Sequence, residues 1–235
     1  MPDVQRVYGR ASLPTGVETD VWTLGTTVPV YPWPTEARPL RIRAGGNPAD
    51  TAAGAGARLV VVDGLDDDFN PITDVLFPAG AAQSAQTVAV FRRVQLAVVL
   101  QAGTYSGSNV GAITIEDNLG VALAHIPAQA GVAHMSQYTV PAGFRAMFTA
   151  VAITVPGNKA ATLRFKIRRD ADVVGPPATA ALTVTQYDEF LGSELVDFPK
   201  RAAILEPKTD LWLTGNTLLG GGSSCSIEYQ LELWR

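Results

Sequence analysis

The alternation of apolar and polar residues with a period of two limits the fold of this chain more than any other feature of its sequence. In the segment Cys225 to Trp234, apolar residues alternate with residues that are mainly polar. The segment TLRFKIRRD repeats the pattern, with Leu163, Phe165 and Ile167 as its apolar positions. Successive side chains of a strand point to opposite faces, whereas a helix needs apolar residues three or four positions apart. Both segments therefore predict strands that bury one face.

Strand-like segments recur along the chain, with turn residues roughly every ten positions. In Leu40 to Val75, two predicted strands over 40–43 and 58–63 precede an acidic turn, and a return strand follows over 72–77. The other predicted strands cover 87–91, 93–100, 112–116, 121–126, 145–155, 161–169, 182–187, 194–198, 210–214 and 225–234. A long segment with a helical pattern is absent. We expect an all-β fold made of antiparallel β-sandwiches or jelly rolls.

Two local arrangements can be predicted in the first half of the chain. Val94, Leu96, Val98 and Leu100 occupy alternate positions, so we expect them to share one face of a strand. The stretch 101–111 is rich in Gly, Ser and Asn, which is the composition of a hairpin tip. We therefore expect the strands on either side of it to pair with each other.

The predicted strands fall into two sets. A small, polar, glycine-bearing stretch at 127–136 separates them, so we expect two tandem β domains over 37–130 and 131–235. Residues 1–36 are punctuated by prolines and contain the aromatic segment VYPWP around Trp33, which predicts an extended N-terminal arm. Such an arm either packs on its own domain or reaches a neighbouring subunit, in which case Trp33 is an interaction residue.

The charge balance and the single cysteine exclude several classes. The net charge of -4 and the pI of 5.2 argue against a nucleic-acid partner, because phosphate neutralisation needs clustered Lys and Arg. No window approaches the ~18 apolar residues of a membrane span, so we expect no membrane partner. The first residues lack a signal-peptide pattern, and we expect synthesis in the cytoplasm. Cys225 predicts a small buried residue and no intrachain disulfide.

The acidic turn contains the strongest candidate for a metal site. Asp66, Asp68 and Asn70 have the spacing with which calcium-binding loops begin. However, Pro71 occupies the position of the glycine that makes the sharp turn in such loops, and no carboxylate follows at the bidentate position. The sequence therefore favours a solvated hairpin turn over a calcium site, and we expect no cofactor.

No other pattern predicts a catalytic centre. His125 and His134 have no spacing that suits a shared metal, and no serine lies in a G-x-S-x-G pattern. The carboxylates that could form a glycoside-hydrolysis pair are Asp188, Glu189, Glu194, Asp197 and Asp210. Their spacing does not distinguish them from ordinary exposed charges. We expect a protein that is not an enzyme.

One strand carries a predicted basic face. Arg164, Lys166 and Arg168 alternate with apolar residues and therefore lie on the same side of the strand over 161–169. Such a face is ordinarily hydrated, and its functional interpretation is docking to an acidic surface of a partner protein. Together with Trp33, these three residues are the candidate interaction residues.

Several long segments resemble one known group of proteins. They are AGGNPADTAAGAGARLVVVDGLDDDFNPITDVL, FRRVQLAVVLQAGTYSGSNVGAITIED and IPAQAGVAHMSQYTVPAGFRAMF, followed by ILEPKTDLWL and the closing strand. These segments resemble tailed-bacteriophage virion structural proteins over roughly residues 37–235. The pair Phe69 and Asn70 and the run GSNVGAI that ends at Ile113 fit the pattern, whereas the opening arm and 170–180 depart from it.

The resemblance implies an all-β, non-enzymatic component of a phage particle, such as a capsid decoration (cement) protein, a head fibre or a tail-associated protein. We expect a decoration protein, made in the host cytoplasm and located in the virion. Its expected partners are the major capsid protein or other virion proteins, and we expect a homotrimer, because closed symmetry hides open strand edges.

Two alternatives remain open at the level of the sequence. The first is a tail fibre, nozzle or baseplate component of the same particle. The second belongs to another class, a β-sandwich that binds host glycans through stacking on tryptophan, and its candidate residues are Trp22, Trp33, Trp212 and Trp234.

Overall fold

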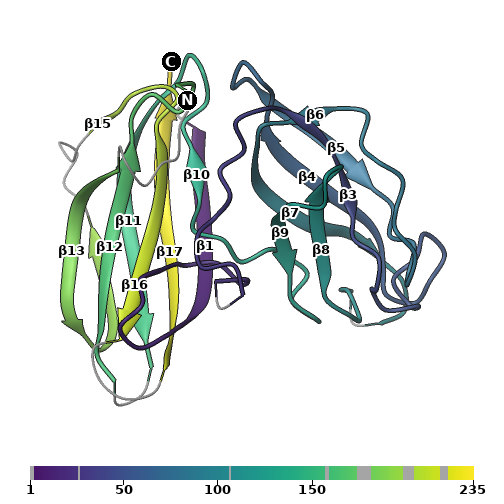
Figure 1. The fold of residues 1–235 in the computed structure, drawn as a ribbon, viewed down its shortest axis with the longest axis horizontal. Helices are drawn as coiled ribbons and strands as arrows, with labels where there is room; N and C mark the ends of the chain where they lie inside the picture. Colours follow the sequence, from purple (N-terminus) through teal and green to yellow (C-terminus); the bar gives the residue numbers. More distant parts are fainter. Residues whose placement is uncertain are drawn as a thin grey trace. The chain divides into compact units, whose positions relative to one another are not determined.

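The computed structural model describes residues 3–25, 27–105, 107–156, 159–173, 181–197, 204–217 and 222–235. The chain forms two compact units, one made of residues 1–31 together with 135–235 and the other of residues 32–134. All regular elements among the described residues are strands (Figure 1). Within these residues no helix is long and apolar enough to cross a membrane. The all-β fold class predicted from the sequence is confirmed.

The first unit contains two antiparallel sheets. One has the strand order β1-β17-β11-β14, with β15 also paired to β11, and the other has the order β10-β16-β12-β13, with β2 also paired to β16. The strands of the first sheet are β1 (Asp3–Leu13), β11 (Arg145–Val155), β14 (Gly192–Asp197), β15 (Ile204–Leu205) and β17 (Ser223–Trp234). Those of the second are β2 (Thr19–Asp20), β10 (Tyr138–Thr139), β12 (Ala161–Arg168), β13 (Leu182–Phe190) and β16 (Asp210–Thr217).

The order of these strands is that of a jelly roll. We count β2 and β10 as one strand position and set the short β15 aside, which gives eight positions among the described residues of the unit. In chain order, the sheets then read 1-8-3-6 and 2-7-4-5. Two Greek keys produce this order, because β14, β16 and β17 each lie beside an earlier strand and not beside their immediate predecessor. The jelly roll expected from the sequence is therefore present in the first unit.

The second strand position is interrupted by the whole of the other unit. β2 pairs with Thr214 and Gly215 of β16, and β10 pairs with Asp210 and Leu211 of the same strand. Between them, the Val21 amide donates to the Leu213 carbonyl at 2.8 Å. An antiparallel bridge joins Trp22 to Met135, so the chain leaves the jelly roll and re-enters it at neighbouring residues.

Aromatic residues from both sheets fill the centre of this sandwich. The rings of Phe148 on β11 and Phe165 on β12 meet edge to face at 5.4 Å, and Tyr229 on β17 lies 5.6 Å and 5.9 Å from them. The Tyr229 hydroxyl donates to the Ser136 carbonyl at 2.7 Å. The buried phenol is thus satisfied by the segment that re-enters the jelly roll.

The second unit has two smaller antiparallel sheets with the orders β5-β4-β7 and β6-β3-β8-β9. The strands are β3 (Arg38–Ile42), β4 (Ala57–Leu65), β5 (Pro71–Leu76), β6 (Val90–Phe91), β7 (Arg93–Ala102), β8 (Ile113–Asp117) and β9 (Ala122–Ile126). Val60 and Val62 of β4 and Ile115 of β8 are completely buried. Strands β7 and β9 adjoin, which brings the two sheets together along one side.

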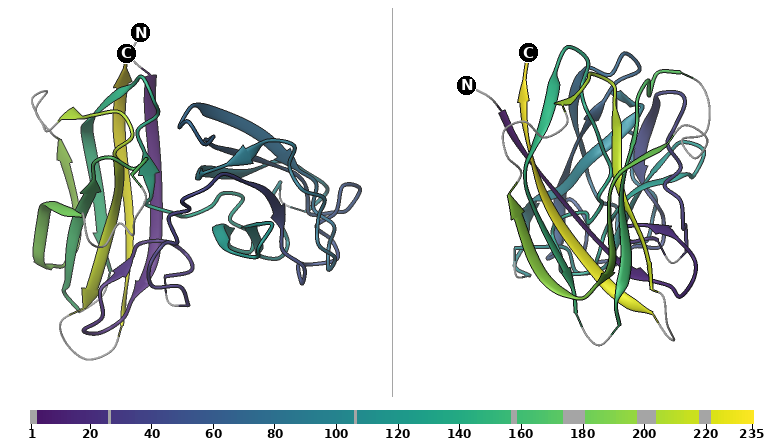
Figure 2. Two further views of the ribbon diagram at one scale, coloured as in Figure 1. Left: turned by 45° about the horizontal axis from the view of Figure 1, so that its top comes forward. Right: turned by 90° about the vertical axis from the view of Figure 1, so that its left-hand side faces the viewer.

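The opening residues form a strand and not an extended arm. β1 pairs with β17 along its whole length, from Asp3 opposite Leu233 to Leu13 opposite Ser223 (Figure 2). Its inward positions include Gly9 and Ala11, whose small size hid the alternation in the sequence. A side chain at Gly9 would come within 3.0 Å of Ser136 and of the Val21 carbonyl, so a larger inward residue does not fit there.

The limits of the compact units differ from those predicted. The sequence predicts boundaries after residues 36 and 130, whereas the structure groups residues 1–31 with 135–235. The change of unit between His134 and Met135 does lie inside the stretch 127–136 that was predicted as a boundary. Strand pairing between β1 and β17 determines the grouping, and no local pattern in the sequence reports a partner more than two hundred residues away.

The predicted hairpin across residues 101–111 is wrong. β7 pairs with β4, whereas β8 pairs with β3 and β9 in the other sheet. The Asn109 side chain holds this connection, because its amide donates to the carbonyls of Gly111 and Pro127. The Gly/Ser/Asn-rich stretch is therefore a crossing between sheets and not a hairpin tip.

The prediction that Val94 shares a face with Leu96, Val98 and Leu100 is also wrong. The pairing of β4 with β7 shifts register between Asp63 and Gly64, so that Leu96 lies opposite Asp63 but Val94 lies opposite Gly64. A β-bulge adds one residue to a strand and reverses the alternation beyond it. Val94 is consequently buried, while Leu96 and Leu100 are exposed.

The jelly roll predicts a large difference between two leucines of the first unit. Leu213 on β16 has no exposed area, whereas Leu195 on β14 is 67% exposed. Leu213→Ala leaves a cavity and is expected to lower the free energy of unfolding by about 2–5 kcal/mol. Leu195→Ala is expected to change it by less than ~0.5 kcal/mol. Urea denaturation of both variants checks this, and equal effects would contradict the assignment of Leu213 to the core.

Candidate functional site

The predicted basic face is neutralised within the chain. Lys166 Nζ lies 2.5 Å from one Glu18 carboxylate oxygen and Arg164 lies 3.5 Å from the other. The Thr214 hydroxyl also donates to Glu18. Partial burial acts to raise the pKa of Glu18, but the Lys166 and Thr214 hydrogen bonds and the two positive charges lower it overall. Arg164 and Lys166 therefore already have an acidic partner, which the sequence analysis did not foresee.

Arg168 lies in a buried ion pair and not on a hydrated face. Its Nη2 atom is 2.7 Å from the Asp210 carboxylate, and its Nε also donates to that carboxylate at 3.1 Å. The Thr139 hydroxyl donates to the other Asp210 oxygen at 2.6 Å. Both charged side chains are almost entirely buried. This cluster ties β12 and β16 to β10, so the structure gives Arg168 an internal contact.

Trp33 is an internal residue of the second unit. Its side chain is buried, and the Arg93 guanidinium lies 5.3 Å from the centre of its ring. The same guanidinium lies 5.5 Å from the Phe69 ring and donates to the Pro34 carbonyl. A buried arginine between two rings gains cation–π attraction from both. The structure therefore uses Trp33 to hold the segment after Tyr31 against β7.

The acidic turn lies between β4 and β5 and is held by its own hydrogen bonds. One Asp66 carboxylate oxygen accepts from the Asp68 and Asn70 amides at 2.9 Å and 2.8 Å. The other accepts from the Asn70 side chain at 3.3 Å. Phe69 takes a positive φ of 66° in this turn and is completely buried. The turn thus inserts an aromatic ring into the core, and within the described chain no cluster of three or more His, Cys, Asp or Glu residues forms a metal site.

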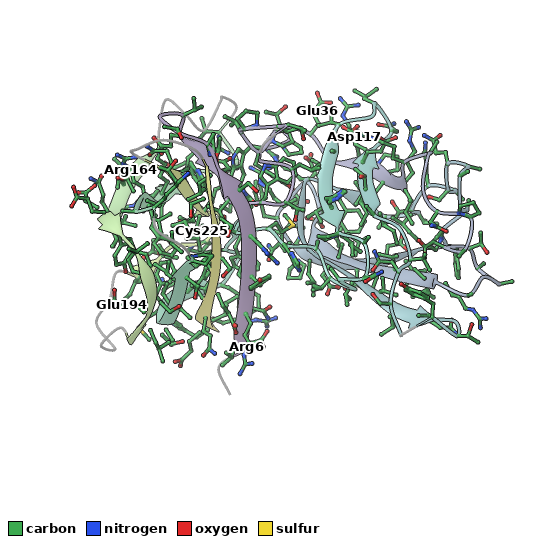
Figure 3. The ribbon with its side chains drawn as sticks, turned by 90° about the horizontal axis from the view of Figure 1, so that it is seen from below. Arg6, Glu36, Asp117, Arg164, Glu194 and Cys225 are labelled. Carbon is green, nitrogen blue, oxygen red and sulfur yellow. The ribbon has the colours of Figure 1, made fainter. Side chains whose placement is uncertain are left out.

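The residues considered for catalysis do not gather into one site among the described residues. Asp210 belongs to the buried ion pair, and Asp188 accepts from the Gln186 amide. Glu194 lies on β14 of the other sheet, on an outer surface of the unit (Figure 3). Glu189 is exposed, and the side chain of Asp197 and residue Phe198 lie outside the described part of the chain.

His125 and the cysteine have packing environments. The Thr114 hydroxyl lies 2.9 Å from His125 Nδ1. Burial, followed by the positive charge of Arg43, lowers the pKa of His125. Cys225 lies inside the sandwich (Figure 3), where burial raises the pKa of its thiol to about 12. A thiol of this kind stays protonated and unreactive at neutral pH.

The tryptophans offer little surface for sugar stacking. Trp22, Trp33 and Trp212 are all buried, and only Trp234 is partly exposed. Trp22 packs edge to face on Tyr31 at 5.2 Å, and its ring nitrogen donates to the Val28 carbonyl. Stacking on a glycan needs an open aromatic face, which these three residues do not present.

Asp50 is a buried acceptor that joins three segments of the second unit. Its Oδ1 atom accepts from the Ala57 amide at 2.8 Å and the Val110 amide at 2.9 Å, and its Oδ2 atom accepts from the Gly111 amide at 2.8 Å. Asn109 acts beside it, because its carbonyl oxygen accepts from the Gly131 amide. These two residues lie in the segments that carry the resemblance to virion proteins, and here they organise loops.

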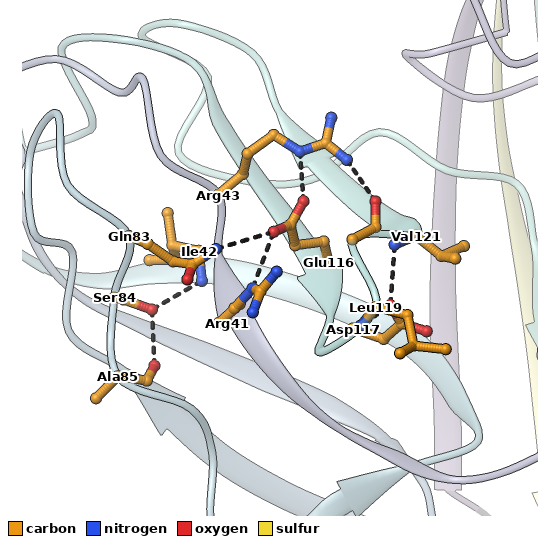
Figure 4. A network of polar contacts seen from close by, with 11 residues as sticks. Arg41, Ile42, Arg43, Gln83, Ser84, Ala85, Glu116, Asp117, Leu119 and Val121 are labelled. Carbon is orange, nitrogen blue, oxygen red and sulfur yellow. Dashed lines mark hydrogen bonds and ion pairs between the residues drawn. The ribbon is translucent and has the colours of Figure 1, made fainter.

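Glu116 is the centre of a second polar cluster (Figure 4). It lies on β8 and accepts from Arg41 Nε at 2.9 Å and from Arg43 Nε. Arg43 also donates to the Gly120 carbonyl at 2.9 Å. Partial burial acts to raise the pKa of Glu116, but the hydrogen bonds and charges of the two arginines lower it. The cluster therefore fixes β3 against β8 and the following turn.

Asp20 is a buried carboxylate at the end of β2, shortly before the chain enters the second unit. One of its oxygens accepts from the Tyr31 amide at 2.7 Å, and its own amide donates to the Pro29 carbonyl at 2.7 Å. Burial raises the pKa of Asp20 to about 7, although the Tyr31 hydrogen bond and the charge of Lys166 act in the opposite direction. Asp20 thus holds the loop through which the chain leaves the jelly roll.

Sequence reasoning missed these buried acceptors for an identifiable reason. Asp50 and Asn109 stand among Gly, Ala and Ser, where short polar residues ordinarily indicate exposed turns. Their partners are backbone amides, which every residue type except proline carries. One feature of the sequence could have indicated these acceptors. Each is a single Asp or Asn between stretches of small residues, and these stretches are too apolar for an exposed loop.

Comparisons with known proteins give no family. No protein-family model matches the chain, and neither does any curated protein sequence. Among solved structures, that of infectious bursal disease virus strain Gt is similar at 11% identity, over 99% of this chain and 70% of that chain, with a TM-score of 0.23. T=1 particles derived from the same virus are similar at 14% identity, over 99% of this chain and 69% of that chain, with a TM-score of 0.23. TM-scores this low do not establish a shared fold.

Removing the Asp50 carboxylate tests its role in the second unit. Asp50→Ala leaves three backbone amides without an acceptor, so the free energy of unfolding is expected to fall by at least ~2 kcal/mol. Hydrogen exchange followed by mass spectrometry should show faster exchange at Ala57, Val110 and Gly111. Asp68→Ala, in the exposed turn, is the control and should leave these amides protected. Unchanged exchange in Asp50→Ala would contradict the role of Asp50.

The raised pKa of Asp20 predicts a pH dependence of stability. The folded pKa of about 7 exceeds the ordinary value of 3.8, so the unfolded chain loses the proton first as the pH rises. The contribution of Asp20 to stability is therefore complete below pH 3.8, falls between about pH 4 and pH 7, and stays level above that range.

Asp20→Asn carries no titrating proton and is the variant that isolates this effect. Between pH 4 and pH 8, the wild type is expected to lose up to ~4 kcal/mol of unfolding free energy relative to Asp20→Asn. Urea denaturation at both pH values measures the difference. A difference that is the same at pH 4 and pH 8 would rule out a raised pKa at Asp20.

Proposed function

We propose that this protein is a non-enzymatic structural component of a tailed-phage particle and that it serves as a capsid decoration protein. The observation that carries the proposal is an apolar border on the jelly roll. β13 and β14 stand at the ends of their two sheets, next to each other in the chain. The exposed large apolar side chains of this border are Leu182, Val184, Leu191, Leu195 and Ile204. Exposed apolar side chains spread along an open sheet border support a role in protein–protein contact.

The distribution of charge supports the same function. The cations of the predicted basic face are paired with Glu18 and Asp210, so a partner has little net charge to recognise on that face. Apolar contact at the border formed by β13 and β14 is then the means by which we expect the jelly roll to dock on a partner. Jelly rolls are also a recurrent architecture of viral capsid proteins. Both points agree with the resemblance of the sequence to phage virion structural proteins.

A decoration protein of this kind acts without chemistry. A protein that binds the assembled shell, and not the dissociated subunits, stabilises the shell by mass action. The major capsid protein is the proposed partner, and a homotrimer is the proposed form, since threefold closure hides open strand edges. A tail-associated role uses the same surfaces and differs in copy number, which is hundreds per particle for a shell cover and roughly a dozen or fewer for a tail part.

Addition of the purified protein to undecorated capsids tests the proposal. The protein is expected to bind in stoichiometric amounts and to raise the temperature at which the capsids release their DNA. Leu195→Glu places a charge on the apolar border and should reduce binding by about tenfold or more. Val4→Glu, at an exposed position on β1 at the opposite end of the same sheet, is the matched control and should bind normally. Failure of the wild type to bind, or binding with no change in heat resistance, would contradict a decoration function.

A further inference from the structure

The outer face of the sheet β5-β4-β7 is an apolar surface in three rows. Val75, Val61 and Val98 lie opposite one another across the three strands and form the central row. Side chains that pair directly across an antiparallel ladder lie on the same face. An isolated bridge places Val132 opposite Val98, which extends the row to four valines.

The rows on either side are also mainly apolar. On one side, Thr73 lies opposite Asp63, which lies opposite Leu96. On the other side, Leu59 precedes the inward Val60, and Phe77 follows the inward Leu76. Leu100 lies at a register shift beside this third row. We call this surface the valine face, and its apolar residues are Leu59, Val61, Val75, Phe77, Leu96, Val98, Leu100 and Val132.

The valine face is open although the sheet beneath it is well packed. Val60, Val62 and Leu76 point to the inner side and are completely or almost completely buried. In contrast, Phe77 is 55% exposed and Leu100 is 69% exposed. The exposure therefore reflects an uncovered second side of a well-formed sheet, since the same strands bury their other side fully.

The valine face has almost no charge to select a partner. Asp63 is the one charged residue in its three rows, and its carboxylate accepts from the Thr73 hydroxyl at 2.6 Å. A face of this composition has the character of the core of a homo-oligomer interface, where charged residues are depleted. It offers no charge complementarity to an acidic or basic partner surface.

One edge of this sheet, that of β7, is already paired with a neighbouring segment, which favours the face as the surface for association. On the outer side of β7, the Val99 amide donates to the Gly131 carbonyl, and the Ala133 amide donates to the Ala97 carbonyl. At β5, the Asp74 carboxylate accepts from the Val88 and Ala89 amides and holds that loop near the strand. Addition of a strand from another chain is therefore hindered along the β7 edge.

We infer that the valine face is the surface through which copies of this chain associate with one another. Its exposed side chains amount to roughly 400 Å² of apolar area. Two such faces in contact, together with their rims, remove about 1,200 Å² from water, which is the lower limit for a specific interface. Identical flat faces pack as aligned sheets, and the same patch serves on every subunit. The inference does not depend on the proposed virion function, which uses the border of the other unit.

Sedimentation equilibrium of the purified full-length protein tests the inference. The wild type is expected to associate at micromolar concentration, with the face-to-face dimer as the smallest associated species. Leu100→Glu should lower the association constant by at least about tenfold. Leu119→Glu is the matched control, because Leu119 is 67% exposed and lies on the turn between β8 and β9. This control should associate like the wild type. Both variants should also have the same monomer melting temperature as the wild type, which shows that they are folded.

A cross-linking experiment gives an independent result. Leu100→Cys adds one accessible thiol, while Cys225 is buried in the jelly roll and serves as a silent background. A short bis-maleimide reagent should link Leu100→Cys into dimers and leave Leu119→Cys and the wild type as monomers. A monomeric wild type, or association that Leu100→Glu leaves unchanged, would overturn the inference. If the wild type is monomeric and Leu100→Glu no longer binds the capsid shell, the inference is also wrong, and the valine face is a contact surface for the shell.

Discussion

The hydrogen bonds along the edge of β16 are the interaction on which the first unit depends. Two segments of only two residues each, β2 and β10, supply them from positions on either side of the inserted unit. The Leu213 carbonyl and amide between these pairings are bonded to the Val21 amide and the Ser136 hydroxyl. Without these contacts a central part of the sheet would present unpaired backbone groups at a buried position. The jelly roll therefore closes only when the chain has returned from the second unit.

The strands themselves could be predicted from the sequence, because alternation is a local property. The predicted strand over 145–155 has the bounds of β11, and the predicted segments at 161–169 and 225–234 correspond closely to β12 and β17. Partner choice could not be predicted, since β1 and β17 meet across nearly the whole chain. A two-residue strand such as β2 is too short to show an alternating pattern. The register shift between Asp63 and Gly64 reverses the alternation of β7, so Val94 lies on the opposite face from Leu96.

The candidate site could be predicted only in part. Charged and polar residues were identified by type, but their partners were not. Glu18 forms ion pairs with Arg164 and Lys166, and Asp210 forms an ion pair with Arg168. The three basic residues predicted to face a partner are therefore paired with acidic residues of the same chain. The exposed apolar surface could not be predicted either. Alternating valines indicate that these residues share one face of a strand, but they do not indicate whether that face is covered or exposed. The register of β4 with its neighbours places these valines in one row, and the exposure of Val75 shows that this row stays open.

Hydrogen exchange at increasing denaturant concentration tests the central claim most directly. The account predicts that residues 3–13 lose protection together with 145–155 and 223–234, in one cooperative step, because they belong to one jelly roll. Residues 32–134 are predicted to open as a separate unit at a different denaturant concentration. Loss of protection in residues 3–13 at low denaturant, independent of β11 and β17, would contradict the assignment of β1 to the same cooperative jelly roll.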